Sequence, residues 1–473
     1  MGDMVTPMNR RDFLATMAVS AASRAVFAQQ GPTALPPRRE LLIRNAYVMT
    51  MDPALGDIAG GDVHVRNGAI VAVGKGINAP AARVLDGRRK VVIPGLVETH
   101  WHMWNTLLRS FAGDKADQGY FPTAAALGAV MTPDDMYHGT RLAAAEALFS
   151  GITTAHDYCH NVRSRAHAEA DIRALHEAGL RARWSFGWAQ GQPDSETVNL
   201  ADLEALHSQW DEYSNEGLIT MGFAWRSMFR NSPLPPRVYR TEFEAARRLG
   251  LPISAHIGSS EQAVGQIEAH AKENLLGKDV QLIHALSASA GEIQMVASAG
   301  ASVSVSPGTE LRIGYGFPKV SEFLDAGVRV GMSVDTTVLS GDANPFDILK
   351  MIRNNENARA RSEFKFSARR ALELGTIEGA RCLGIDQLVG SLKPGKRADI
   401  VMISTDSINL GALTDPAHMV VEAVQPANVD TVIVDGRIHK RAGKLTSISM
   451  ERVLQDSAAS FNAMRTRAKW RLP

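Results

Sequence analysis

Eight apolar segments, each short enough to be a strand, alternate with stretches of helical periodicity through the middle of this chain. TPDDMYHGTRLAAAEALFS and RAHAEADIRALHEAGL are two of the intervening helical stretches. Strands that alternate with helices form parallel sheets, and eight such units over about 250 residues predict an α/β fold, the (β/α)8 barrel. The strand candidates are residues 91–98, 152–158, 180–188, 219–226, 252–258, 280–287, 301–307 and 328–335.

Five side chains of types that bind metals lie at or near the ends of these candidates. They are His100 and His102 in VVIPGLVETHWH, His256 in LPISAH, His284 in VQLIHALS and Asp335 in VRVGMSVD. Residues two apart on a strand face the same side, so both histidines of the first pair can point at one ion. A lone histidine is commonly a structural residue, but the position that all five share favours a metal site. In a barrel this is also the end that carries the active site.

Shorter alternating segments flank the barrel on both sides. LLIRNAYVMT and DVHVRNGAIVAVGK come before it, and VDTVIVDGRIHKRAGK comes after it, with Asn-Gly and Asp-Gly turn signals between strands. We expect residues 38–93 and 388–447 to form one composite β-sandwich domain. The barrel then occupies residues 94–387, and residues 448–473 form a helical tail.

The composition favours a small molecule as the partner. Hydrophobic residues make up 45% of the chain and charged residues 21%, as in an ordinary globular protein. Lys and Arg number 51 against 50 Asp and Glu, so the total charge gives no sign of nucleic acid or of a membrane surface. The two cysteines are too few for a zinc cluster or a disulfide framework.

Residues 1–30 resemble a twin-arginine export signal. Arg10 and Arg11 precede the small-residue apolar stretch LATMAVSAAS, and the segment Val26-Phe27-Ala28 offers a cleavage site. We therefore expect export of the folded protein to the periplasm, with no stable membrane association after processing. The alternative is an N-terminal helix on a cytoplasmic protein.

The motifs together resemble the amidohydrolase superfamily, in the branch of cytosine deaminase, adenosine-type deaminases and triazine hydrolases. They are PGLVETHWH, GITTAHDY, SAH, LIHA, SVDTT, GSLKPGKRADIVM and VIVDGR, and they cover nearly the whole chain after residue 30. The resemblance implies a metal-dependent hydrolase of non-peptide C–N bonds (EC 3.5). It also implies an oligomer, a dimer or larger.

The resemblance also implies roles for the five strand-end residues. His100, His102, His256 and Asp335 would bind one divalent metal, and His284 would contact the reactive water or the substrate. Two-metal members carry a bridging lysine on the third or fourth strand, but RARWSFGW and ITMGFAWRS contain none. We therefore expect a single ion, zinc in the first place, with iron, manganese and cobalt as alternatives that accept the same ligands.

Asp335 and His284 are the expected catalytic residues. A divalent ion lowers the pKa of water that it binds, which supplies a nucleophile near neutral pH. Asp335 is placed to accept a proton from that water and to pass it to the leaving nitrogen. His284 is expected to stabilise either the oxyanion that forms during attack or the bound hydroxide.

The sequence departs from its relatives just after the fifth strand. Deaminases and triazine hydrolases of this branch place a proton-shuttling glutamate three residues after the histidine, whereas HIGSSEQ has Ser259 there and Glu261 two residues further on. A serine does not shuttle protons in the same way near neutral pH. The departure favours hydrolysis of an amide, urea, carbamate or lactam-like bond. The alternatives are ring deamination with Glu261 as the shuttle and a non-catalytic relative that binds a metal or ligand.

Further candidates for substrate contact lie near the strand ends. Trp104 and Trp188 could form an aromatic wall, Arg226 could bind a carboxylate, and His160 follows the second strand. Ser259 and Glu261 complete this set. Core packing or an ordinary surface position is the alternative for each of them.

Overall fold

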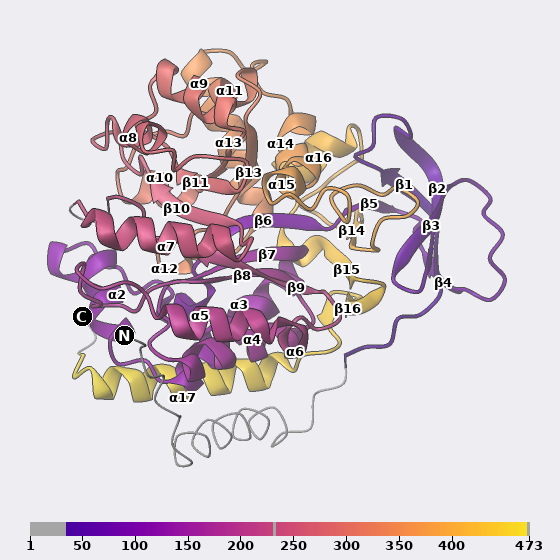
Figure 1. Cartoon of the computed structure of the whole chain (residues 1–473). Coiled ribbons are helices and arrows are strands. Elements are labelled where there is room, and N and C mark those ends of the chain that lie inside the picture. The colour runs from indigo at the N-terminus through magenta and orange to yellow at the C-terminus, as the bar shows by residue number, and fades with distance from the viewer. Residues whose placement is uncertain (1–34, 230–232, 471–473) are drawn as a thin grey trace, which may run out of the picture. The chain divides into compact units, whose positions relative to one another are not determined.

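Eight parallel strands form a barrel, and they are arranged around it in the order in which they follow one another along the chain (Figure 1). The structure is a computed structural model and describes residues 35–229 and 233–470. A parallel bridge between Trp101 and Asp335 joins the first strand to the segment after the last and closes the barrel. The predicted (β/α)8 fold is confirmed. Its strands are β6 (Leu96–Trp101), β7 (Ile152–Cys159), β8 (Arg181–Phe186), β9 (Ile219–Ala224), β10 (Ile253–Ile257), β11 (Val280–His284), β12 (Ser302–Val305) and β13 (Arg329–Met332).

Helices lie around the strands, and some of them begin at capping boxes. Thr132 and Asp135 form a capping box that begins α3, and Gly151, with φ 97°, ends it. Ser289 and Glu292 form the same box at α9. The helices are α2 (Tyr120–Gly128), α3 (Pro133–Ser150), α4 (Arg165–Ala178), α5 (Leu200–Ser208), α6 (Trp210–Tyr213), α7 (Pro236–Arg248), α8 (Gln266–Lys272), α9 (Ala290–Ala299), α10 (Pro307–Arg312), α11 (Val320–Asp325), α12 (Thr337–Ser340), α13 (Pro345–Ala360), α14 (Ala368–Leu374), α15 (Ile377–Cys382), α16 (Pro416–Glu422) and α17 (Met450–Arg467), with short 3₁₀ turns at Met103–Leu108, Ala116–Gln118 and Pro426–Asn428.

Strands from both ends of the chain form a second, mixed sheet beside the barrel (Figure 1). The C-terminal strand β14 pairs antiparallel with the N-terminal strand β5, so the two ends share one hydrogen-bonded sheet. Ile43, Val65, Leu392 and Ile400 belong to the apolar core that they share. Its strands are β1 (Leu41–Met49), β2 (Asp57–Arg66), β3 (Ala69–Gly74), β4 (Arg83–Asp86), β5 (Lys90–Pro94), β14 (Ile400–Ser404), β15 (Val429–Val434), β16 (Arg437–Arg441) and β17 (Lys444–Leu445).

The strand expected over 91–98 is two strands that belong to different sheets. β5 pairs with β14 and β1, whereas β6 pairs with β7. Gly95 separates them, and its amide donates to the carbonyl oxygen of Asp399 at 2.8 Å. A Cβ atom at Gly95 would lie 2.0 Å from Oγ1 of Thr153, so only glycine fits where the chain passes from one sheet to the other.

A buried ion pair fastens the mixed sheet to the barrel. Arg181, at the start of β8, donates from Nε and Nη2 to the two oxygens of Asp399, at 2.7 and 3.0 Å. The backbone N–H of Asp435 also donates to Asp399, and Asp435 is itself paired with Arg397 and Arg437. These contacts satisfy a carboxylate that is costly to bury unpaired.

The C-terminal helix α17 packs along α3 (Figure 1). Ser460 donates to Oδ1 of Asp135 at 2.5 Å, and Arg467 forms an ion pair with the other oxygen. Asp135 is also the residue whose side chain accepts the backbone N–H of Thr132 in the capping box of α3. One carboxylate therefore caps one helix and anchors another.

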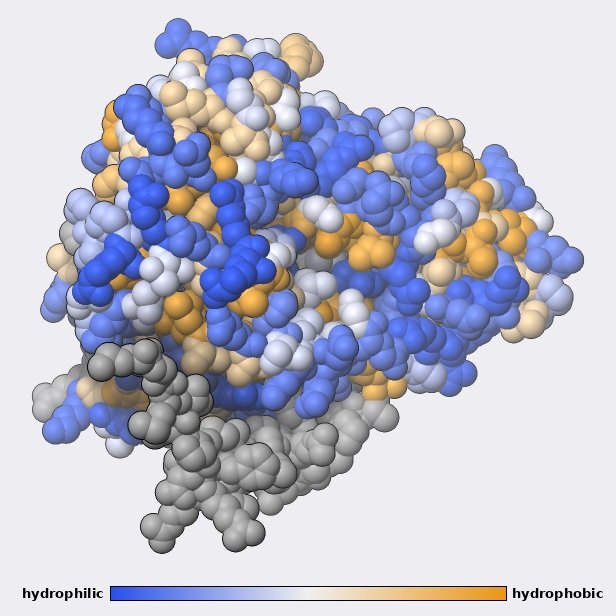
Figure 2. Space-filling model, in the orientation of Figure 1, coloured by the Kyte–Doolittle hydropathy of each residue, from blue (hydrophilic) through white to orange (hydrophobic). Residues whose placement is uncertain are grey.

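Hydrophilic residues cover most of the face shown in Figure 2, and hydrophobic residues form scattered groups between them. Within residues 35–229 and 233–470, no helix combines the length and the hydropathy needed to cross a membrane. The export segment predicted at residues 1–30 lies outside the described residues.

Removing the carboxylate of Asp399 should destabilise the protein, because Arg181 would lose both hydrogen bonds to its nearest partner and be left buried with Asp435, 3.7 Å away, as the remaining carboxylate. We expect Asp399→Ala to lower the free energy of unfolding by about 3 to 5 kcal/mol, measured by urea denaturation. Asp86→Ala, which removes an exposed pair with Arg88, is the control and should leave the unfolding midpoint unchanged. Equal midpoints for Asp399→Ala and the parent would contradict this assignment.

Candidate metal centre

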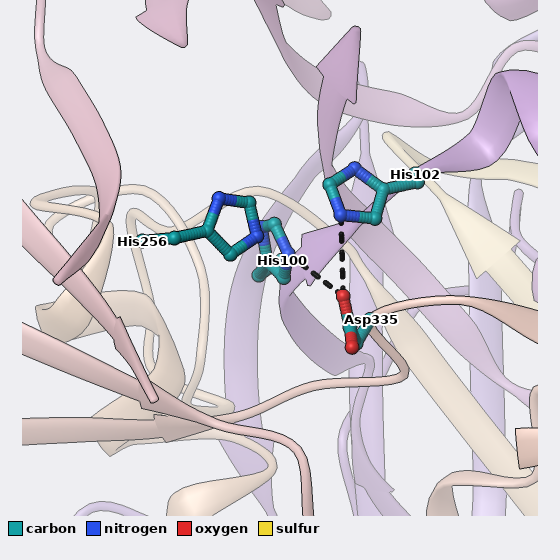
Figure 3. A group of neighbouring side chains, drawn as sticks. All are labelled: His100, His102, His256 and Asp335. Carbon is teal, nitrogen blue, oxygen red and sulfur yellow. Dashed lines mark hydrogen bonds and ion pairs between the residues drawn. The ribbon is translucent and has the colours of Figure 1, made fainter. Parts of the chain in front are cut away.

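Four side chains converge at the C-terminal end of the barrel, and they are the four predicted as metal ligands (Figure 3). His100 lies on β6, His102 directly follows that strand, His256 lies on β10 and Asp335 follows β13. One ligand atom from each lies within 4.8 Å of the others. The Nε2 atoms of His100 and His102 lie 3.1 and 3.3 Å from Oδ1 of Asp335.

The protonation states of this cluster suit a cation. Burial lowers the pKa of His100 to about 3 and holds the pKa of His256 well below its usual value, so both imidazoles are neutral. Burial alone would raise the pKa of Asp335, but hydrogen bonds from His100 and His102 outweigh it and hold the pKa well below the usual range. Neutral imidazoles and one carboxylate form a donor set that fits a divalent first-row metal.

Glu98 and His156 fix the backbone around the cluster. Glu98 accepts the N–H groups of His100, His156 and Val334, at 2.8, 3.3 and 3.2 Å, and so joins three strand ends. Burial raises the pKa of Glu98 more than these hydrogen bonds lower it, and the resulting pKa is about 8. The His156 ring is held by the carbonyl oxygen of Thr99 and by a serine hydroxyl on β8.

His284 has a buried carboxylate partner that the sequence analysis missed. Nδ1 of His284 lies 2.9 Å from Oε1 of Glu310, and both side chains are almost completely buried. Glu310 lies on α10, within a segment whose sequence resembles a glycine-rich loop. Only the distance in space between the two residues identifies the pair, and no sequence spacing signals it.

A cavity of about 350 Å³ opens over the metal cluster. His102, His256, His284 and Asp335 line it. The rest of its wall combines aromatic and apolar side chains with uncharged polar side chains, His160 and Arg226. Its larger apolar lining residues are Tyr120, Phe121, Trp188, Trp225, Phe229, Ile313, Tyr315 and Leu339.

Arg226 lines the cavity, but its charge is already paired. It forms an ion pair with Glu242 in which both side chains are fully buried. The guanidinium also donates to the carbonyl oxygens of Glu196 and Pro193. These contacts hold Arg226 as part of the wall and occupy its two terminal nitrogens, Nη1 and Nη2.

Three predicted contact residues form an aromatic cluster at one side of the cavity. His160 and Trp188 line the cavity, with ring centroids 5.0 Å apart. Trp104 is fully buried behind them and donates from Nε1 to Nδ1 of His160 at 3.2 Å. Trp104 is not among the described residues that line the cavity. It therefore contacts His160 from the side away from the cavity.

Ser259 and Glu261 have different environments. Ser259 lines the cavity, whereas Glu261 is exposed and is not among the described residues of the wall. The backbone N–H of Glu261 donates to the carbonyl oxygen of Tyr315 at 3.0 Å, and its side chain lies against Gly316. The structure therefore brings Ser259 to the site and leaves Glu261 at the surface.

Comparisons of the sequence with a family model and with known proteins agree on one family. The model of the Amidohydrolase family matches residues 91–439. A 5'-deoxyadenosine deaminase from Methanosarcina barkeri is 28% identical over 448 residues, which cover 90% of this chain and 99% of that protein. A 5-methylthioadenosine/S-adenosylhomocysteine deaminase from Acetivibrio thermocellus is 27% identical over 427 residues, which cover 87% of this chain and 96% of that protein.

Solved structures share the fold across almost the whole chain. An adenosine deaminase from Xanthomonas campestris with bound zinc is 24% identical with a TM-score of 0.79, covering 91% of this chain and 100% of that chain. An atrazine chlorohydrolase from Arthrobacter aurescens TC1 complexed with zinc is 22% identical with a TM-score of 0.78, covering 89% of this chain and 100% of that chain.

The assignment of His256 as a ligand predicts its effect on metal content. The purified protein should hold a single divalent ion per chain, measured by elemental analysis. His256→Ala should weaken metal binding by more than the roughly 10- to 100-fold that loss of an outer-shell partner costs. His418→Gln, which alters an exposed histidine, should retain the ion. Full metal content in His256→Ala would contradict the assignment.

His270 should make stability depend on pH. Its Nε2 accepts the N–H of Met228, so Nδ1 carries the proton and donates to the carbonyl oxygen of Gln266. Burial lowers the pKa of His270 to about 4, from 6.5. Between pH 6.5 and pH 4 this histidine is protonated in the unfolded chain but neutral in the folded protein. The free energy of unfolding therefore falls as pH drops through this range, by up to roughly 3 kcal/mol.

His270→Gln should remove this dependence, because glutamine does not titrate. We expect the difference in unfolding free energy between parent and variant to shrink as pH falls from 6.5 to 4. His418→Gln serves as the control and should follow the parent at each pH. If the difference in unfolding free energy between His270→Gln and the parent stays constant across this range, the prediction is wrong.

Proposed function

This chain belongs to the amidohydrolase family, and on that premise we propose that it hydrolyses a non-peptide C–N bond of an uncharged small molecule with an aromatic or apolar body. The class of bond is an amide, urea, carbamate or lactam. The observation that carries the proposal is the combination of a four-residue metal cluster with a cavity whose remaining wall is uncharged or internally paired.

The absence of an unpaired charge in the described wall argues for a neutral substrate. Asp335 and Arg226 are the only Asp, Glu, Lys or Arg residues among the described lining residues. Asp335 belongs to the metal cluster, and Arg226 is paired with Glu242. Away from the metal cluster, a charged substrate group would lose its hydration in this cavity without gaining an ionic partner. The aromatic wall instead offers apolar contact and stacking.

The residues of the cluster suit attack by water on a carbonyl carbon. When bound, a divalent ion supplies water activated near neutral pH and polarises the carbonyl oxygen. Asp335 accepts a proton from the water as the new C–O bond forms. The same proton then reaches the nitrogen as the C–N bond breaks, so that an acid and an amine are released. An amide or carbamate requires no protonation of a ring nitrogen before attack.

Ring deamination is the second candidate, and the identity of the relatives favours it. The two relatives described above that align along most of this chain are deaminases of adenosine derivatives. In this chain the reaction would need a proton donor at the ring, and Glu261 would have to turn inward from its exposed position. That requirement is the reason we rank the reaction second.

We further propose zinc as the ion, export through the twin-arginine signal, and a dimer or larger oligomer as the assembly. The donor set supports zinc, and the two solved relatives described above contain it. Arg10 and Arg11 support export. Family resemblance alone supports the oligomer.

A substrate panel separates the candidates. It contains para-nitroacetanilide, an aryl carbamate, an aryl urea, 5'-deoxyadenosine and an aminopyrimidine, each assayed for amine or ammonia release. We expect turnover of at least one neutral amide, urea or carbamate, and Asp335→Asn should lower kcat by about 10²- to 10⁴-fold because the proton acceptor is lost.

Glu261→Gln decides between the two reactions. It should leave hydrolysis of the amide-type substrates unchanged, because the carboxylate lies outside the cavity. Ammonia release from the adenosine or pyrimidine probe that disappears in Glu261→Gln would favour deamination. Full metal content without turnover of any compound would favour a non-catalytic role.

A further inference from the structure

The carboxylate of Glu310 lies directly behind His284, on the side away from the cavity. His284 lines the cavity and Glu310 does not appear among the described lining residues. Oε1 of Glu310 accepts the N–H of Ser306 at 2.8 Å and lies 2.9 Å from Nδ1 of His284. An ionised carboxylate only accepts hydrogen bonds, so Nδ1 is the donor toward the carboxylate of Glu310.

This hydrogen bond fixes which ring nitrogen faces the reaction. With the proton on Nδ1, the ring presents Nε2 as an acceptor whenever it is neutral. Burial lowers the pKa of His284, but the hydrogen bond to Glu310 and the charge of Asp335 outweigh burial and raise it above its usual value. The backbone adds to the constraint, because His284 and Ala285 have φ values of 74° and 53°. Non-glycine residues adopt this left-handed conformation when the surrounding structure holds them there, and such residues cluster at functional sites.

The other histidines of the cavity wall make different contacts. His102 and His256 belong to the metal cluster. His160 receives the indole N–H of Trp104 on Nδ1. Ser259 occupies the position where a carboxylic acid follows the fifth strand in related deaminases. Of the histidines in the described wall, His284 therefore meets two conditions together. It lies outside the metal cluster, and it is hydrogen-bonded to a buried carboxylate.

We propose that Glu310 is a positioning residue that acts through Nδ1 of His284 and holds Nε2 toward the attacking water. The inference rests on the proposed function and deepens it. Nε2 accepts a hydrogen bond from the water and aligns its oxygen with the carbonyl carbon. A water proton passes to Asp335 and then to the leaving nitrogen, so Glu310 and His284 are unchanged at the end of the cycle.

A purely structural role for Glu310 makes a different prediction. Glu310 reaches back to the N–H of Ser306, the residue that precedes α10, and so helps to begin that helix. If this were its whole role, its removal would lower stability and leave the tautomer of His284 and the kcat of the folded enzyme unchanged. Glu356 offers a matched control, because it is a buried carboxylate that accepts the N–H groups of Val320 and Ser321.

The test compares Glu310→Gln, Glu310→Ala and Glu356→Gln in the metal-loaded full chain. Nitrogen-15-labelled histidine is followed by NMR, with His284→Asn used to assign the Nδ1–H signal. We expect Glu310→Ala to lose the hydrogen-bonded Nδ1–H signal and Glu356→Gln to keep it. With para-nitroacetanilide, Glu310→Ala should lower kcat by about 10- to 100-fold and change KM little.

Glu310→Gln keeps the proposal testable if the alanine variant fails to fold. Its amide oxygen can still accept from Nδ1, so it should retain the ring signal and more of the kcat than Glu310→Ala. An unchanged ring signal in folded Glu310→Ala, or a kcat that follows stability alone as in Glu356→Gln, would overturn the proposal. No turnover of the probe by the parent would count against the proposed function, whereas the ring signal reports the Glu310–His284 geometry independently.

Discussion

The barrel closes at the seam between β6 and the segment after β13, and the metal cluster depends on that closure. The amide of Asp335 donates to the carbonyl oxygen of His100 at 2.9 Å, and the amide of His102 donates to the carbonyl oxygen of Asp335 at 2.7 Å. These two backbone hydrogen bonds join residues that lie more than two hundred positions apart in the chain. They set the position of three of the four cluster residues, so the strands that complete the fold also complete the site.

Packing inside the barrel supports the seam. Gly331 on β13 faces Thr99 on β6, where a Cβ atom would lie 2.4 Å from Cγ2 of that threonine. The hydroxyl of Thr99 lies 2.7 Å from the hydroxyl of Ser304 and donates to the carbonyl oxygen of Met332 at 2.9 Å. A small residue on one strand therefore admits a hydrogen-bonding residue on the next. The resulting close approach leaves little freedom for the ends that carry His100 and Asp335.

The sequence was sufficient to predict those features of the structure that leave a local or periodic pattern in it. Alternating apolar and helical segments predicted the barrel, and the shared position of five polar residues at strand ends predicted the cluster. The boundary at Gly95 was missed: Pro94-Gly95 is typical of a turn, but the apolar residues on both sides allow one strand to be read through it, and only folding shows that the two halves pair in different sheets. Glu310 and the pairing of Arg226 were missed for a related reason. Both depend on partners brought close by folding, which no spacing in the sequence reports.

The pairing of β14 with β5 has a consequence for how the chain reaches its native state. β5 ends at Pro94 and its partner begins at Ile400, so ribosomes must add about 300 residues before the sheet can join, which takes roughly 15 to 60 s at usual synthesis rates. Until then the edges of the early strands remain open to other chains. Pairing of β14 with β5 therefore follows synthesis of all eight barrel strands, and during that interval the nascent chain carries an unpaired strand edge that can associate with other chains.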